Sequence, residues 1–138
     1  MKAYLGIGTN LGDRAANLHR VVEMINEQAG HVLACSSFME TEPWGFTSDN
    51  AFLNAVVEID TPHSPYELLH ITQKIEREMG RAHKSTNGNY TDRIIDIDIL
   101  LYGDERINEP DLIIPHPLMW QRSFVYEPLW EIAPHLKP

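Results

Sequence analysis

One stretch constrains the fold of this chain more than any other, the run Arg-Ile-Ile-Asp-Ile-Asp-Ile-Leu-Leu-Tyr-Gly at residues 93–103. It is rich in β-branched and large apolar residues, and Gly103-Asp104 supplies a turn signal directly after it. This combination predicts a β-strand that ends in a hairpin. Because the strand is so apolar, we expect it to be central in its sheet.

Two aspartates interrupt this strand, two residues apart. Side chains alternate between the faces of a strand, so Asp96 and Asp98 share one face, with roughly 6–7 Å between their Cα atoms. The other face should be core and carries Ile95, Ile97, Ile99 and Leu101. Buried carboxylates need a cation or many hydrogen-bond donors to stay ionised. The pair therefore predicts one or two hard divalent metal ions such as Mg²⁺, and the alternative is a solvated face.

The bulk composition limits the possible classes of protein. A length of 138 residues predicts a single domain, 1–138. The formal net charge of −9 argues against sequence-independent nucleic-acid binding, which needs a basic surface. A single cysteine, Cys35, excludes an intramolecular disulfide and favours a reducing compartment. No apolar run approaches the ~18 residues of a membrane span and no signal peptide opens the chain, so we expect a cytoplasmic protein without a membrane partner.

Periodicity, capping residues and turn signals predict the element order β-α-β-β-α-β. The expected elements are strand 2–9, a helix from Asp13 to Gly30, strand 32–38, strand 52–60, a helix from Ser64 to Gly80, and the aspartate strand. A return strand from Arg106 and a proline-rich tail follow. This order suits a ferredoxin-like α+β sandwich with an added C-terminal hairpin and short helices.

Several residues outside the aspartate strand have chemical potential. Gly6 and Gly8 leave one face of strand 2–9 without bulk, so something is expected to approach the backbone there. Asn54, next to Phe52, suggests an amide that reads a ligand edge beside a stacking ring. The segment 81–92 is locally basic and leads into the aspartate strand, as phosphoryl transfer requires, although a polar loop is the simpler interpretation.

Two further segments leave their interpretation open. The aromatic residues of the 40–50 loop could form a lid, a ligand platform or a staple on the core. On the second helix, polar residues three or four positions apart form one flank, which is usually solvated. They are Gln73, Glu76 and Arg77.

Motifs along nearly the whole chain resemble the 6-hydroxymethyl-7,8-dihydropterin pyrophosphokinase family of folate biosynthesis. The most specific is Arg-x-x-Asp-x-Asp at 93–98, followed by Pro-His-Pro at 115–117. Others are Tyr-Leu-Gly-Ile-Gly-Thr-Asn-Leu-Gly at 4–12, Phe-Leu-Asn at 52–54, Gln-Lys-Ile-Glu at 73–76, Gly-Arg at 80–81 and Glu-Ile-Ala-Pro at 131–134. The resemblance implies transfer of the β,γ-diphosphate of ATP to the pterin hydroxymethyl oxygen, with AMP as the second product.

The resemblance also implies roles for residues. Asp96 and Asp98 would hold two Mg²⁺ ions, and Arg81 and Arg93 would steady the migrating diphosphate. The implied ATP-binding positions are Gln73, Glu76, Arg81, Arg93, Ile99, His116 and Arg122. The implied pterin-binding positions are Thr41, Trp44, Phe52, Asn54, Asp96 and Phe124. ATP and the pterin are the expected partners of an enzyme that acts as a monomer.

The chain departs from the family pattern in places. Arg81-Ala82-His83 replaces a common Arg-x-Arg, an Arg-Trp pair is absent near Tyr90, and the chain stops at Pro138, short of a final helix of longer members. Two alternatives compete with the resemblance: another two-metal enzyme on the same fold, such as a nucleotidyl cyclase or polymerase palm, and a non-catalytic ferredoxin-like binding module.

Overall fold

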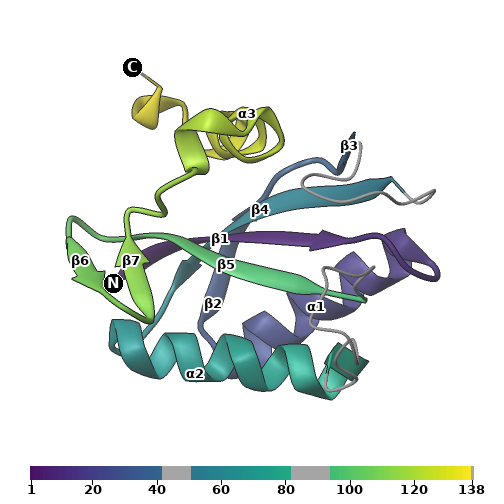
Figure 1. Cartoon of the computed structure of the whole chain (residues 1–138), viewed down its shortest axis with the longest axis horizontal. Helices are drawn as coiled ribbons and strands as arrows, with labels where there is room; N and C mark the ends of the chain where they lie inside the picture. Colours follow the sequence, from purple (N-terminus) through teal and green to yellow (C-terminus); the bar gives the residue numbers. More distant parts are fainter. Residues whose placement is uncertain (42–50, 82–93, 138) are drawn as a thin grey trace.

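The structure, a computed structural model, describes residues 1–41, 51–81 and 94–137, and describes Arg81 by its backbone alone. The protein is a mixed helix and antiparallel-sheet fold in which the sheet lies between two helices and a third (Figure 1). We call the face of the sheet that carries α1 and α2 the first face and the opposite one the second face. None of the described helices is long and apolar enough to cross a membrane.

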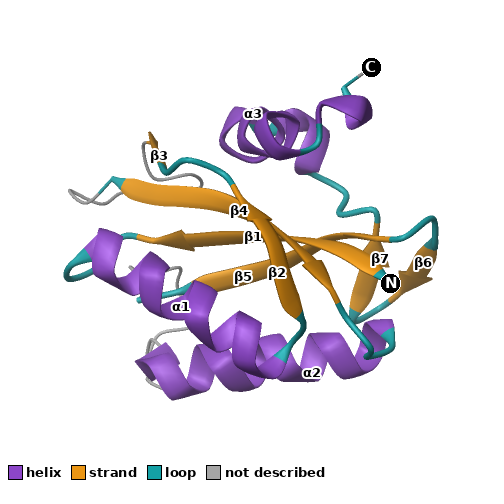
Figure 2. Ribbon diagram, turned by 180° about the vertical axis from the view of Figure 1, so that it is seen from behind, coloured by secondary structure: helices purple, strands orange, loops and turns teal. Residues whose placement is uncertain are grey.

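The main sheet is built around β1 (Lys2–Thr9), which pairs antiparallel with β4 (Phe52–Asp60) and β5 (Asp96–Tyr102). Two short strands, β2 (His31–Cys35) and β3 (Met39–Thr41), both pair with β4. The strand order is β2-β4-β1-β5 (Figure 2). Within the described part of the chain, the aspartate strand β5 is therefore an edge strand of this sheet, and the prediction of a central position is wrong.

Two capped helices cover the first face. The helix α1 (Arg14–Gln28) begins where the side chain of Asp13 accepts a hydrogen bond from the backbone N–H of Ala16. The helix α2 (Pro65–Glu76) begins with the predicted capping box of Ser64 and Glu67. A π-helical turn, η1 (Arg77–Arg81), continues α2, and Gly80 ends it with φ of 102°. Both helices were predicted from their caps and periodicity, and the structure confirms them.

The larger core lies between these helices and the sheet. Alternate residues of β1 and β4 meet one stripe from each helix, as the sequence periodicity predicts. Its fully buried members include Leu5, Leu18, Val21, Ile25, Ile59, Leu68, Ile75 and Ile95. This core holds more buried apolar residues than the second core described below.

A smaller core covers part of the second face. The helix α3 (Ser123–Ile132) crosses that face above β4 and is flanked by the short turns η2 (Met119–Gln121) and η3 (Pro134–Leu136). Buried here are Tyr4, Val56, Leu100, Met119, Val125, Leu129 and Ala133. The side chains of Ser37 and Glu131 join α3 to the segment that links β2 and β3, with Ser37 N–H donating to Glu131 Oε2 at 2.7 Å.

The alternation of β5 fails near its end. Tyr4 pairs with Leu101 and Leu5 pairs with Ile99, so Leu100 is an extra residue on β5, a β-bulge. Leu100 joins the smaller core, and Leu101 packs beside it. The prediction that Leu101 lies on the first face is wrong, because the bulge reverses the parity of the strand after Ile99.

Two other expectations need correction. The predicted strand 32–38 is shorter, and β3 follows it unpredicted, because Ser36 bonds Val56 through both its backbone and its hydroxyl and interrupts the strand. After the turn at Gly103, β6 (Ile107–Glu109) pairs with β7 (Leu112–Ile114) and does not return along β5.

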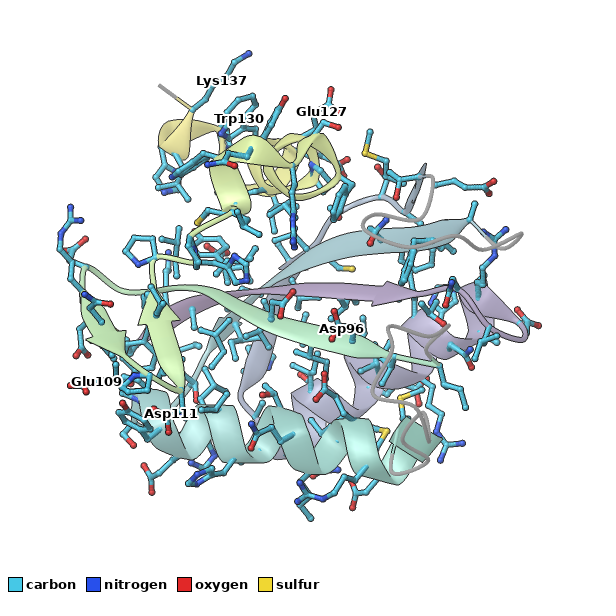
Figure 3. All side chains as sticks on the ribbon, viewed as in Figure 1. Asp96, Glu109, Asp111, Glu127, Trp130 and Lys137 are labelled. Carbon is cyan, nitrogen blue, oxygen red and sulfur yellow. The ribbon has the colours of Figure 1, made fainter. Side chains whose placement is uncertain are left out.

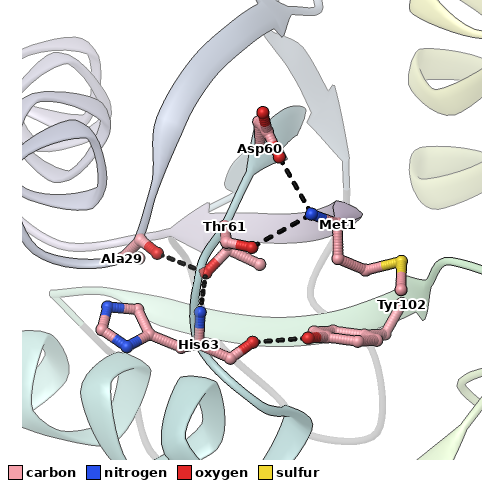
Figure 4. Close-up of polar contacts among 6 residues, drawn as sticks. All are labelled: Met1, Ala29, Asp60, Thr61, His63 and Tyr102. Atoms are coloured by element: carbon pink, nitrogen blue, oxygen red, sulfur yellow. Dashed lines mark hydrogen bonds and ion pairs between the residues drawn. The ribbon is translucent and has the colours of Figure 1, made fainter.

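Polar contacts close one end of the sheet (Figure 4). The amine of Met1 donates to Asp60 at 3.0 Å and to the Thr61 carbonyl at 3.1 Å. The Thr61 hydroxyl donates to the Ala29 carbonyl at 2.6 Å, and Tyr102 donates to the carbonyl of His63. Close packing at this end also explains Gly30, because a Cβ there would lie 2.6 Å from the Asp60 carbonyl oxygen.

Candidate functional site

The part of the second face near Thr9, away from α3, has a floor of glycine. In the sheet register, Gly8 of β1 lies between Asn54 of β4 and Asp96 of β5. One step along, Gly6 lies between Val56 and Asp98. The central strand therefore places no side chain between the polar groups on its two neighbours.

An added side chain would be excluded at one of the two glycines and tolerated at the other. A Cβ on Gly8 would lie 2.7 Å from the side-chain oxygen of Asn54, closer than real contacts allow. A Cβ on Gly6 would meet only the Leu100 side chain, at an ordinary 3.5 Å. The predicted close approach to the backbone thus occurs at Gly8, and the approaching group is the chain's own Asn54.

Asn54 is held in place by β3. Its side chain is 7% exposed, and its Nδ2 donates to Thr41 Oγ1 at 2.9 Å and to the Met39 carbonyl at 3.4 Å. Thr41 pairs directly with Phe52 in the β3–β4 register. Three of the residues predicted to bind the pterin therefore lie on this short ladder, with Asn54 bonded to Thr41 and Thr41 paired with Phe52.

The aspartate pair lies on the opposite flank of the glycine floor. Ile95, Ile97 and Ile99 enter the first-face core, so Asp96 and Asp98, which alternate with them, project from the second face. Both aspartates are partly buried, and Figure 3 labels Asp96. Their oxygens are hard ligands of the kind that Mg²⁺ selects. Within residues 1–41, 51–81 and 94–137 there is no group of three or more His, Cys, Asp or Glu side chains that could hold a metal.

His116 lies within electrostatic reach of Asp96 on β5 and of Arg122 at the start of α3. Its backbone N–H donates to the Leu100 carbonyl at 3.0 Å, and its Nδ1 accepts from the Leu118 backbone N–H at 3.2 Å. Burial lowers the pKa of His116 below its usual 6.5, the Arg122 charge lowers it further, and the Asp96 charge raises it. A neutral imidazole whose Nδ1 accepts a hydrogen bond carries its proton on Nε2.

The start of α3 brings two more predicted residues to this face. The Arg122 guanidinium lies 5.7 Å from the centroid of the Phe124 ring. Phe124 packs against the smaller core. The loss of α3 would therefore remove both an aromatic ring and a cation from the region of the site.

The sequence reasoning missed the position of Glu76. The structure buries it to 6% exposure, and Glu76 Oε2 accepts the backbone N–H of Ile97 at 2.8 Å. The expectation of a solvated flank is wrong for this residue, whereas Gln73 and Arg77 are exposed. A Glu one position after the buried Ile75 and four after the buried Thr72 is a signal that could have indicated burial.

Some predicted site residues cannot be placed. Trp44, Tyr90 and Arg93 lie outside the described residues, as does the side chain of Arg81. Ile99 is 5% exposed and its side chain belongs to the first-face core, so any contact with ATP would come from its backbone.

Comparisons with known proteins converge on one family. Residues 4–134 match the family described as 7,8-dihydro-6-hydroxymethylpterin-pyrophosphokinase. The 2-amino-4-hydroxy-6-hydroxymethyldihydropteridine pyrophosphokinase of Porphyromonas gingivalis is 52% identical over 136 residues, which cover 98% of this chain and 92% of the relative. The protein of the same name from Bacillus subtilis is 43% identical over 132 residues, 95% of this chain and 77% of the relative.

A solved structure supports the same fold. The crystal structure of Plasmodium falciparum HPPK-DHPS with pteroate aligns with a TM-score of 0.54 at 15% identity. The alignment covers 91% of this chain and 34% of that one. At this identity the likeness concerns the fold alone.

Proposed function

The chain belongs to the 7,8-dihydro-6-hydroxymethylpterin-pyrophosphokinase family and transfers the diphosphate of ATP to 6-hydroxymethyl-7,8-dihydropterin in folate biosynthesis. We propose that this reaction takes place on the part of the second face where Gly8 forms the floor. Family membership decides against the binding module and the cyclase or polymerase alternatives. The observation that carries the proposal is the row Asn54, Gly8 and Asp96. In this row a fixed amide on β4 and a carboxylate on β5 lie on either side of a glycine that has no side chain.

The pterin binds on the β4 side of this row. Thr41 and Asn54 hydrogen-bond the edge of the heterocycle, and Phe52 and Phe124 lie against its faces, with Trp44 nearby. Flat heterocycles are well bound between aromatic rings with a few fixed polar groups. The mutual hydrogen bond of Thr41 and Asn54 supports this role, because it fixes the amide before a ligand arrives.

Two Mg²⁺ ions are held by Asp96 and Asp98. Mg²⁺ in phosphoryl-transfer sites is commonly bound by one or two carboxylates together with substrate phosphates, so this donor set fits. Bound there, the ions would offset the charge of the phosphates during transfer. The partial burial of both aspartates, beside a floor without side chains, supports the assignment.

ATP binds on the β5 side of the row. Its contacts come from Gln73, Arg81, Arg93, the backbone of Ile99, His116 and Arg122, whereas the Glu76 carboxylate that the resemblance also implied is buried and accepts the Ile97 backbone N–H. The pterin hydroxyl oxygen attacks the β-phosphorus and releases its proton to water, the bond from that phosphorus to the α–β bridging oxygen breaks, and AMP leaves. Arg81 and Arg93 steady the migrating diphosphate. Neutral His116 donates a hydrogen bond from Nε2 to ATP, and the positive charge of Arg122 near it supports phosphate binding.

The finer structural expectations belong to the same proposal. The order β2-β4-β1-β5 with α1 and α2 on one face supports a ferredoxin-like sandwich in a single domain, 1–138, with an added C-terminal hairpin and short helices. We also expect a cytoplasmic monomer that takes only ATP and the pterin as partners, without nucleic acid or membrane.

Formation of AMP from ATP tests the assignment of the aspartates. Asp96→Ala and Asp98→Ala should each lower kcat by at least about 100-fold, ~2.7 kcal/mol of barrier, while the thermal midpoint changes little. The exposed Asp104, just after β5, provides the matched control, and Asp104→Ala should keep wild-type turnover. Chelation of Mg²⁺ should stop the wild-type reaction, and addition of Mg²⁺ should restore it.

Two results would contradict the proposal. One is turnover above a tenth of wild type in both aspartate variants, because metal catalysis at that pair could not survive their loss. The other is AMP formation that proceeds equally well without the pterin alcohol, because the diphosphate would then have another acceptor.

A further inference from the structure

Glu76 is a buried carboxylate at the boundary between α2 and the aspartate strand. Its side chain is 6% exposed, and its Oε2 lies 2.8 Å from the backbone nitrogen of Ile97. Ile97 is the residue between Asp96 and Asp98. A carboxylate is costly to bury, so its retention at this boundary calls for a reason beyond packing.

The Glu76 carboxylate supplies a hydrogen-bond acceptor at an edge of β5 where no described strand supplies one. Among the strands that the structure describes, β5 pairs with β1 alone and is an edge strand. Hydrogen-bonding groups of successive residues on an antiparallel strand point alternately to its two edges. The Ile97 N–H, which donates to Glu76, points to the outer edge, away from β1. Glu76 therefore replaces the neighbouring strand that this N–H would otherwise need.

The tether acts on the segment that carries the aspartates. The next described tether on the outer edge is the hydrogen bond from His116 N–H to the Leu100 carbonyl, at the bulge. On the inner edge the aspartates pair with glycines, which provide no side chains to support them. The Glu76 bond thus fixes the backbone midway between the two carboxylates.

We propose that Glu76 is a positioning residue that sets the spacing and direction of the Asp96 and Asp98 carboxylates by holding the Ile97 backbone. This inference rests on the proposed function of the aspartate pair. It differs from the role of nucleotide contact that the resemblance implies, because it requires the reach of the side chain to a backbone N–H and not its charge.

Two conservative variants separate reach from charge. Glu76→Gln keeps an acceptor at the same reach without the charge, and Glu76→Asp keeps the charge but draws the acceptor back by one methylene. Outer-shell partners of metal ligands typically contribute about 10- to 100-fold in metal affinity or activity. We therefore expect Glu76→Asp to raise the Mg²⁺ concentration for half-maximal rate by about 10-fold or more, and Glu76→Gln to stay close to wild type.

Glu78 provides the matched control. It lies two residues away, is solvent-exposed, and bonds Gln28 and Lys74 on the outside of the protein. Glu78→Ala should change neither the Mg²⁺ dependence nor the KM for ATP. A merely structural role for Glu76 would lower the thermal midpoint of both Glu76 variants without a selective change in Mg²⁺ dependence.

Amide hydrogen exchange in the metal-free protein gives a readout independent of activity. The Ile97 amide should be protected in wild type and in Glu76→Gln, and should exchange faster in Glu76→Asp. The inference is overturned if Ile97 protection is the same in all three proteins, or if Glu76→Gln loses Mg²⁺ dependence as severely as Glu76→Asp. If wild type itself shows no Mg²⁺-dependent transfer, the proposed function of the aspartate pair fails instead.

Discussion

The two faces of the sheet differ in their side chains and in the helices that cover them. The first face is apolar along its length and is covered by two capped helices, α1 and α2. The second face is apolar only under α3, and beyond that helix β1 presents Gly6 and Gly8 between polar neighbours. Burial is concentrated on the first face, and among residues 1–41, 51–81 and 94–137 no helix covers the part of the second face near Gly8. The helix α3 contributes both to stability and to the proposed site, because it covers part of the second face and carries Phe124.

The largest expected effect comes from opening either core. Leu18 lies in the first-face core and Leu129 in the second-face core, and both are fully buried. Leu→Ala at such positions costs about 2–5 kcal/mol in the free energy of unfolding, from lost burial and the cavity left behind. Denaturant unfolding of Leu18→Ala and Leu129→Ala should give losses in this range for both.

Pterin affinity should separate the two variants where both are folded. Leu129→Ala loosens α3, so pterin binding measured by calorimetry should weaken, whereas Leu18→Ala should bind as wild type does. Equal affinity in the two variants would mean that α3 supports the fold but not the site.

The next effect tests the glycine floor. Gly8→Ala should displace the Asn54 side chain, because the new Cβ would lie 2.7 Å from its oxygen, and pterin affinity should fall by about 10-fold, ~1.4 kcal/mol. Gly6→Ala is the matched control, since its Cβ meets Leu100 at an ordinary 3.5 Å. Calorimetry with the pterin measures both, and a similar loss in the two variants would show that the Asn54 contact is not the cause.

The first face could be read from the sequence almost completely. Its strands alternate except at the register shifts in β2 and β5, and its helices carry capping residues and one apolar stripe each, so local signals and tertiary packing agree over most of this face. The positions of Asp96, Asp98 and Asn54 on the second face followed from the same alternation. The resemblance to the family supplied the roles that alternation cannot give.

What the sequence could not provide depends on contacts between distant segments. The bulge at Leu100 is a mismatch between β1 and β5, and neither strand alone encodes it. The edge position of β5 is decided by where β6 and β7 go, and its apolar composition suggested a centre. Glu76 looked like a surface residue because its partner is a backbone N–H twenty-one positions away.

A smaller effect is expected at the α2 cap, which belongs to the first face. Ser64→Ala removes the side chain that accepts the Glu67 N–H and should lower the free energy of unfolding by about 1 kcal/mol, without a change in pterin affinity.

The backbone N–H of Ser64, and then its hydroxyl, lower the pKa of Glu67 below the usual 4.5. The stabilisation from this carboxylate is present above pH 4.5 and is lost as the pH falls through the lowered pKa. Thermal unfolding at pH 7 and pH 3 should show a smaller pH effect in Glu67→Gln.

The smallest effect, in free energy, concerns His116 on the second face. Because burial and then the Arg122 charge lower its pKa, the folded state binds this proton less readily than the unfolded state does. The contribution of neutral His116 to stability is present above pH 6.5 and is lost as the pH falls from there through the lowered pKa. NMR titration of the imidazole should show Arg122→Ala raising the pKa and Asp96→Ala lowering it further, since the Asp96 charge acts in the opposite direction. Shifts of the same sign in the two variants would mean that His116 does not sense the charges of both Arg122 and Asp96, and that the start of α3 and the aspartate strand do not form one site around this imidazole.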